Sequence, residues 1–92
     1  MRVVWTENAH FTFDSILTQI ENKWGEEIAL EFYLATHQKI TLIEANPYLY
    51  KESSIPNTRH AVISKQTSML YEIGLDAVLI LFFFDNRQEP FI

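Results

Sequence analysis

This chain of 92 residues has 12 acidic and 7 basic side chains, a formal charge of −5, and 48% apolar residues. Its length fits one small domain, residues 1–92, and its apolar fraction excludes global disorder. Because the chain has no cysteine, it offers no disulfide framework and no thiolate metal site, and we expect a cytoplasmic protein.

The negative charge is concentrated in the first half of the chain. Residues 6–46 have seven acidic side chains and two lysines, whereas residues 47–92 have five acidic side chains and four cations. A protein that binds nucleic acid by general electrostatics normally has a basic face. We therefore expect no direct, sequence-specific DNA binding by the chain alone.

No membrane association is expected either. The longest apolar run, residues 77–84, has eight residues, whereas a spanning helix needs about 20. This run is rich in Val, Ile and Phe, which favour a buried strand. Glu7 comes too early for the N-terminus to be a signal peptide.

The first half of the chain predicts a short strand followed by two helices. Arg2–Trp5 is β-branched and reads as the strand, and Thr6 is a suitable N-cap for the first helix. Gly25 ends this helix, and Asn46 with Pro47 ends the second. Both helices have apolar residues at helical spacing. These are Ala9, Phe13, Ile16, Leu17, Ile20 and Trp24, then Ala29, Phe32, Tyr33, Ile40 and Ile43.

The second half predicts a loop and then three strands. Residues 47–58 contain two prolines and read as the loop, and the strands cover residues 59–66, 68–73 and 78–84. A short connection between the helices favours an antiparallel hairpin, and the successive strands favour an antiparallel meander. The expected fold is therefore α+β, in the order β-α-α-β-β-β, with the helices packed on one face of the sheet.

Familiar catalytic and metal-binding patterns are missing from the sequence. His10, His37 and His60 lack the spacing of metal ligands, so we expect no metal and no cofactor. Neither a glycine-rich phosphate loop nor a nucleophile elbow occurs.

A scattered set of polar residues on or beside the last three strands remains as candidate chemistry. Its members are Arg59, Lys65, Tyr71 and Arg87. Cations and a tyrosine on one sheet surface could hold a phosphate backbone and stabilise the charge of phosphodiester cleavage. The plainer interpretation, which the residues alone favour, is a sheet edge protected by charge. Arg87 is the least ordinary of the set, because it follows a buried run within a cluster of polar residues.

A series of short motifs, in their order and spacing, resembles the RelE/ParE superfamily of type II toxin–antitoxin toxins, and its ParE-like branch most. The motifs are residues 3–9, 13–16, 24–25 with Ala29 and Phe32, 46–47, 59–60, 71–73 and 84–90. The resemblance covers essentially the whole chain. It implies a toxin of a plasmid stabilisation system, neutralised by a cognate antitoxin whose C-terminal part wraps around it.

The resemblance leaves the molecular target open. ParE-like members are associated with inhibition of DNA gyrase, and RelE-like members with cleavage of mRNA in the ribosome. The low number of cations favours gyrase, because a protein target requires no basic face. The alternatives are a RelE-like endoribonuclease that uses the four residues above, and a non-catalytic module that binds the antitoxin. Candidate target- or partner-binding residues are Arg87, Asn86, Arg59, Phe11, Tyr48 and Tyr50.

Overall fold

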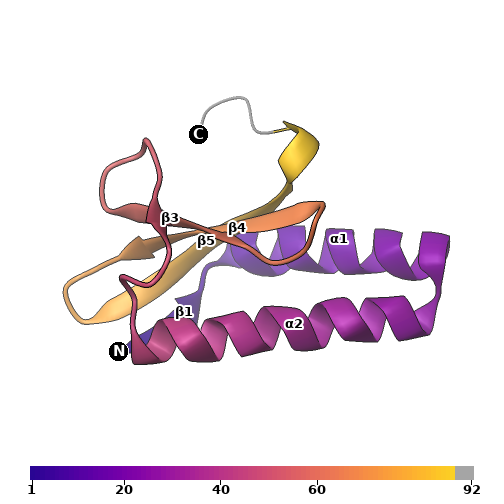
Figure 1. Ribbon diagram of the computed structural model, residues 1–92, viewed down its shortest axis with the longest axis horizontal. Helices are drawn as coiled ribbons and strands as arrows, with labels where there is room; N and C mark the ends of the chain where they lie inside the picture. Colours follow the sequence, from indigo (N-terminus) through magenta and orange to yellow (C-terminus); the bar gives the residue numbers. More distant parts are fainter. Residues whose placement is uncertain (89–92) are drawn as a thin grey trace.

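The structure, a computed structural model, describes residues 1–88 and has the expected α+β order. Glu89 and Pro90 of the last motif lie outside the described residues. The elements are β1 Arg2–Trp5, α1 Glu7–Trp24, α2 Glu26–Ala45, β2 Lys51–Glu52, β3 Thr58–Val62, β4 Thr67–Ile73, β5 Ala77–Asp85 and a 3-10 turn at Asn86–Gln88. The helices form an antiparallel hairpin that covers one face of the sheet (Figure 1).

Both predicted boundaries of α1 are confirmed. The Oγ1 atom of Thr6 accepts a hydrogen bond from the N–H of Ala9 at 3.1 Å, as an N-cap does. The same hydroxyl donates to the carbonyl of Ile80 at 2.7 Å, so the cap also fastens α1 to β5. Gly25 has a φ of 99°, which favours glycine, and it is the single residue between the two helices.

The sheet has the strand order β1-β5-β4-β3-β2, with β1 parallel to β5 and the other pairs antiparallel. The meander of the last three strands is confirmed. Parallel neighbours need a connection that crosses from one end of the sheet to the other, and the helical hairpin is part of the connection between β1 and β5. The apolar run 77–84 therefore belongs to an interior strand, β5, with a neighbour on each side.

Two predictions about the second half were wrong. The predicted loop 47–58 contains β2, which pairs with β3 and makes the sheet five-stranded. The strand predicted over residues 59–66 ends at Val62, because a tight turn follows. In this turn the N–H groups of Ile63 and Ser64 donate to the carbonyl of Thr67 at 2.9 and 3.1 Å.

A register shift in β5 is held in place by the first helix. Leu70 is opposite Phe82 and Tyr71 is opposite Ile80, so one residue of β5 is extra at this point. Close to this bulge, the N–H of Phe83 donates to the Oγ1 atom of Thr12 at 2.9 Å. A side chain on α1 thus satisfies a backbone group of a strand 71 residues away.

The core lies between the helical hairpin and the sheet. Its largest fully buried side chains are Tyr71, Ile43, Met69, Ile80 and Val78. Trp24 and Tyr33, which follow the apolar spacing of their helices, are nevertheless 57% and 42% exposed. Trp24 is the last residue of α1, at the turn end of the hairpin, which projects past the strands (Figure 1). Neither helix within residues 1–88 is long and apolar enough to cross a membrane.

Candidate functional site

The structure places the four candidate catalytic residues in two separate groups. Arg59 and Tyr71 are direct partners across β3 and β4. Lys65 lies in the turn that begins at Ile63, and together with Arg87 it lines a cleft beside that turn. Because four positions of extended chain separate Arg59 from Ile63, the groups are about 13 Å or more apart along the strand. The four side chains do not surround one common position.

Tyr71 is a core residue. Its side chain is fully buried, and its hydroxyl donates a hydrogen bond to the carbonyl of Pro47 at 2.7 Å. Burial raises the pKa of Tyr71 to about 12, so the phenol stays neutral at physiological pH. In this arrangement the hydroxyl is directed at the backbone that follows α2 and is shielded from solvent.

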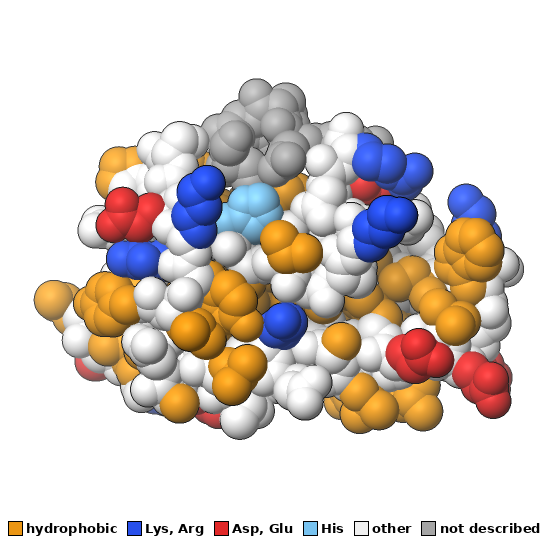
Figure 2. Space-filling view, viewed as in Figure 1, with side chains coloured by type: hydrophobic (Ala, Val, Ile, Leu, Met, Phe, Trp, Pro, Cys, Tyr) orange, Lys and Arg blue, Asp and Glu red, His pale blue; other side chains and the backbone are white. Residues whose placement is uncertain are grey.

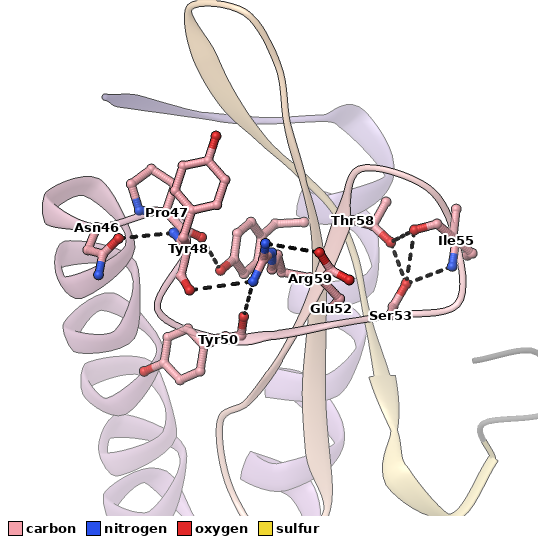
Figure 3. Close-up of polar contacts among 10 residues, drawn as sticks. Asn46, Pro47, Tyr48, Tyr50, Glu52, Ser53, Ile55, Thr58 and Arg59 are labelled. Carbon is pink, nitrogen blue, oxygen red and sulfur yellow. Dashed lines mark hydrogen bonds and ion pairs between the residues drawn. The ribbon is translucent and has the colours of Figure 1, made fainter.

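Arg59 joins the segment after α2 to the edge of the sheet. Figure 3 shows its guanidinium between the backbone carbonyls of Tyr48 and Tyr50 and the carboxylate of Glu52. The shortest of these contacts, from Nη1 to the Tyr50 oxygen, is 2.9 Å, and the one to Glu52 is 3.4 Å. With its side chain only 18% exposed, Arg59 is largely used in holding the protein's own backbone.

The three aromatic candidates for partner binding differ in exposure. Tyr48 is 62% exposed, and the Arg59 guanidinium lies 5.2 Å from its ring centroid. Tyr50 is half-buried, with the Lys39 ammonium 5.8 Å from its ring centroid. Phe11, on α1, is 69% exposed. Tyr48 and Phe11 thus present apolar surface that a partner could cover, and the role of all three stays a prediction.

Arg87 forms a local ion pair just past β5. Its Nη2 and Nε atoms donate to both carboxylate oxygens of Asp85, at 2.6 Å and 3.2 Å to Oδ2 and 3.0 Å to Oδ1. Hydrogen bonds from Arg87 lower the pKa of Asp85 to about 2, and the same pair raises the pKa of Arg87. The side chain of Arg87 is nevertheless 72% exposed, so a partner could still reach the guanidinium.

Asn86 connects the end of β5 to the turn between β3 and β4. Its backbone N–H donates to the carbonyl of Gln66 at 2.7 Å, and its side-chain amide donates to the carbonyl of Lys65 at 3.1 Å. The amide oxygen accepts a hydrogen bond from the buried hydroxyl of Ser68. Asn86 therefore fixes the position of Lys65 relative to Arg87, and its predicted contact with a partner stays a prediction.

The cleft beside this turn has a volume of about 460 Å³ and is formed by both helices, the turn and the end of β5. Apolar side chains of the hairpin line it: Ile16, Ile20, Trp24, Ile28, Phe32 and Ala35. Charged side chains also line it: Lys23, Glu31, Lys65, Asp85 and Arg87. Figure 2 shows this pattern at the right-hand end of the molecule, where blue and red side chains border orange ones. We call this site the hairpin cleft.

The helical half of the hairpin cleft was not predicted from the sequence. Trp24 was assigned only to the apolar face of the first helix, and Lys23 and Ile28 were not singled out. The available signal was the position of Trp24 immediately before Gly25, since the turn of a helical hairpin can extend beyond the surface it covers. Within residues 1–88, no group of three His, Cys, Asp or Glu side chains could hold a metal ion.

Comparison with solved structures identifies the fold. A chain of the chromosomal ParDE toxin–antitoxin system from P. aeruginosa superposes with a TM-score of 0.79 and 20% identity, over 92% of this chain and 95% of that one. A YoeB/ParE toxin from Agrobacterium tumefaciens gives a TM-score of 0.68 and 8% identity, over 94% and 99%. A conserved hypothetical protein from Helicobacter pylori gives 0.60 and 15%, over 95% and 96%. No protein-family model and no curated protein matches the chain.

Along nearly its whole length, the chain thus has the fold of the ParDE-system chain and of the YoeB/ParE toxin. The resemblance inferred from short motifs is confirmed at the level of the fold. At these identities the likeness concerns the fold alone, so activity has to be argued from the residues.

Proposed function

We propose that this chain is the ParE-like toxin of a type II toxin–antitoxin, or plasmid stabilisation, system. It acts in the bacterial cytoplasm, arrests growth by inhibiting DNA gyrase, and is neutralised by a cognate antitoxin. The fold, shared with a chain of a ParDE system and with a YoeB/ParE toxin, supports the toxin assignment. The choice of a protein target rests on the arrangement of the candidate catalytic residues.

The observation that carries this choice is that the side chains of Tyr71 and Arg59 are engaged in hydrogen bonds within the protein. A nuclease needs groups that reach the reacting phosphate and stabilise its developing charge. The Tyr71 hydroxyl is instead buried on the Pro47 carbonyl, and Arg59 donates to backbone carbonyls and to Glu52. Lys65 and Arg87 are exposed but belong to the separate hairpin cleft. Because the four candidate catalytic residues are separated in this way, the arrangement supports a protein target over cleavage of RNA.

The direct test uses purified chain, DNA gyrase, ATP and relaxed plasmid. We expect loss of supercoiling and accumulation of cleaved DNA, which appears as linear plasmid after the protein is removed. Arg87→Ala should weaken the inhibition, because its guanidinium is exposed at the predicted contact. Asp76→Asn changes an exposed loop residue outside both groups and serves as the matched control. Normal supercoiling at a stoichiometric excess of the chain would reject gyrase as the target.

Two other functions give different results in cells. A RelE-like endoribonuclease would produce codon-linked cuts in mRNA, detected by primer extension after induction and abolished by Arg87→Ala. A non-catalytic antitoxin-binding module would leave growth unaffected after strong induction without its partner. Growth arrest with intact transcripts and inhibited gyrase is the result that we expect.

A further inference from the structure

The side chain of Trp5 connects the edge strand β1 to both helices. Its indole stacks on the imidazole of His10 from α1, with the ring centroids 5.1 Å apart, and on the imidazole of His37 from α2, at 5.9 Å. The two imidazole planes are inclined to the indole by 22° and 26°. The last residue of a four-residue edge strand therefore contacts two titratable rings from two different helices.

His37 has further aromatic neighbours. Its ring centroid lies 4.4 Å from that of Tyr33, one turn earlier on α2, and 6.4 Å from that of Phe13 on α1. His37 is half-buried, whereas His10 is exposed and, within residues 1–88, stacks on Trp5 alone. We call Trp5, Phe13, Tyr33 and His37 the Trp5 cluster. Its central imidazole is bordered by aromatic rings from β1, α1 and α2.

Protonation of His37 changes the interaction between these rings. Imidazole is the side chain whose charge ordinarily changes between about pH 5 and pH 8. The faces of aromatic rings carry negative charge density and attract a cation that lies within about 6 Å of the ring centroid. The His37 ring lies within that distance of both Trp5 and Tyr33. The protonated ring therefore gains an attraction to its neighbours that the neutral ring lacks.

The charged side chains on the helices favour the protonated state of this site. Helical spacing places Glu7 and Asp14 one turn before and one turn after His10 on α1. The residues one turn from His37 on α2 are Tyr33 and Thr41, and neither carries a positive charge. Within residues 1–88 neither imidazole has an ion-pair partner, so no carboxylate contact replaces the attraction of the rings.

The two strands beside the Trp5 cluster bring no cation close to it. The neighbour from β5 is the uncharged ring of Phe83, with its centroid 5.4 Å from that of Trp5. Arg2 is at the opposite end of β1 from Trp5, three positions or about 10 Å along the strand. A proton on His37 therefore meets aromatic faces and nearby acidic groups.

We propose that the Trp5 cluster is a proton-responsive contact that holds the helical hairpin to β1 more firmly in mildly acidic solution. Protonated His37 attracts the ring of Trp5 across the boundary between α2 and β1. The added attraction is present while the imidazole is protonated and is lost as the pH rises towards about 8. The inference concerns the attachment of β1 and is independent of the proposed function, so either can fail without the other.

The fluorescence of Trp5 tests the contact directly. Trp24→Phe leaves Trp5 as the single tryptophan of the full chain. A protonated imidazole that touches an indole quenches its emission, so we expect the emission to fall about twofold between about pH 8 and pH 5. His37→Gln in this background should remove most of the change, and His10→Gln a smaller part. His60→Gln replaces the third histidine, outside the Trp5 cluster, and should keep the full change.

Urea denaturation of the natural chain tests whether the contact stabilises the fold. The midpoint of His37→Gln should lie below that of the natural chain at about pH 5, and the difference should shrink at about pH 8. Tyr33→Leu keeps all three histidines but removes one of the rings around His37. It should reduce the pH dependence of the midpoint in the same direction.

Three results would overturn the inference. They are emission of Trp5 that does not change with pH, full quenching retained in His37→Gln, and an equal loss of the urea midpoint at both pH values. The last result would show that His37 contributes packing alone. Inhibition of gyrase by a chain with any of these results would reject the proton-responsive contact and leave the proposed function in place.

Discussion

The hydroxyl of Tyr71 donates a hydrogen bond to the carbonyl of Pro47 at 2.7 Å and thereby joins the middle of β4 to the end of α2. The two residues are 24 positions apart in the chain, and the phenol lies within the core. A residue that sequence patterns offered as a possible catalyst therefore has a clear structural role.

Replacing Tyr71 with phenylalanine should lower stability and leave activity intact. The Pro47 carbonyl loses its donor, so we expect the free energy of unfolding to fall by about 1–2 kcal/mol, measured by urea denaturation. Tyr50→Phe is the control, since the Tyr50 hydroxyl makes no hydrogen bond among residues 1–88 and should change little. Loss of growth arrest in Tyr71→Phe at unchanged stability would instead indicate a catalytic phenol.

Thr12 should be required for the stability of the irregular part of β5. Thr12→Val preserves shape but removes the acceptor of the Phe83 N–H, and leaving that group unpaired should cost about 1–3 kcal/mol. Thr12→Ser keeps the hydroxyl and should retain most of the stability. Thermal unfolding of the two variants provides the comparison. Equal melting temperatures for serine and valine would show that the hydrogen bond contributes little.

Arg59 should stabilise the segment between α2 and β3 through its forked guanidinium. Arg59→Lys keeps the charge but cannot reach Tyr50 and Glu52 with the same geometry, and we expect a loss of about 1–3 kcal/mol. Backbone amides of residues 46–52 should exchange hydrogen faster in this variant. By comparison, Glu52→Gln should change stability by less than about 1 kcal/mol, because that carboxylate is 77% exposed. Unaltered exchange in Arg59→Lys would contradict this role.

Acid titration should reveal the pairing of Asp85 with Arg87. The pair lowers the pKa of the Asp85 carboxyl to about 2, whereas an unfolded aspartate titrates near 3.9. The stabilisation is therefore fully present above about pH 4 and is lost as the pH falls towards 2. Its size should be small, because the guanidinium is 72% exposed.

Carbon-13 NMR of the Asp85 carboxyl gives the direct measurement. Its midpoint should be near 2 in the natural chain and should rise towards the value of a free aspartate in Arg87→Gln. An Arg87→Lys variant retains the charge without the forked geometry and should give an intermediate midpoint. An unchanged midpoint in Arg87→Gln would mean that the ion pair does not form in solution.

Local chemistry accounts for the parts of the fold that could be read from the sequence. The ends of the helices are set by residues at or next to those ends: the Thr6 hydroxyl, Gly25 and Pro47. The apolar run 77–84 indicated an interior strand because such a run needs cover on both faces and both edges. The order of short motifs added the likeness to RelE/ParE toxins, which the solved structures match in fold.

Only the tertiary structure decided which distant residues meet. Three relationships depend on contacts between distant parts of the chain. They are the pairing of β1 with β5, the hydrogen bond between Thr12 and Phe83, and the separation of Arg59 from Arg87. Exposure is likewise a property of the assembled layers. Trp24 follows the apolar period of α1, yet it lies where the hairpin has passed the end of the sheet and is therefore exposed. Periodicity determines which side of a helix is apolar, but the length of the opposing sheet determines how much of that side is buried.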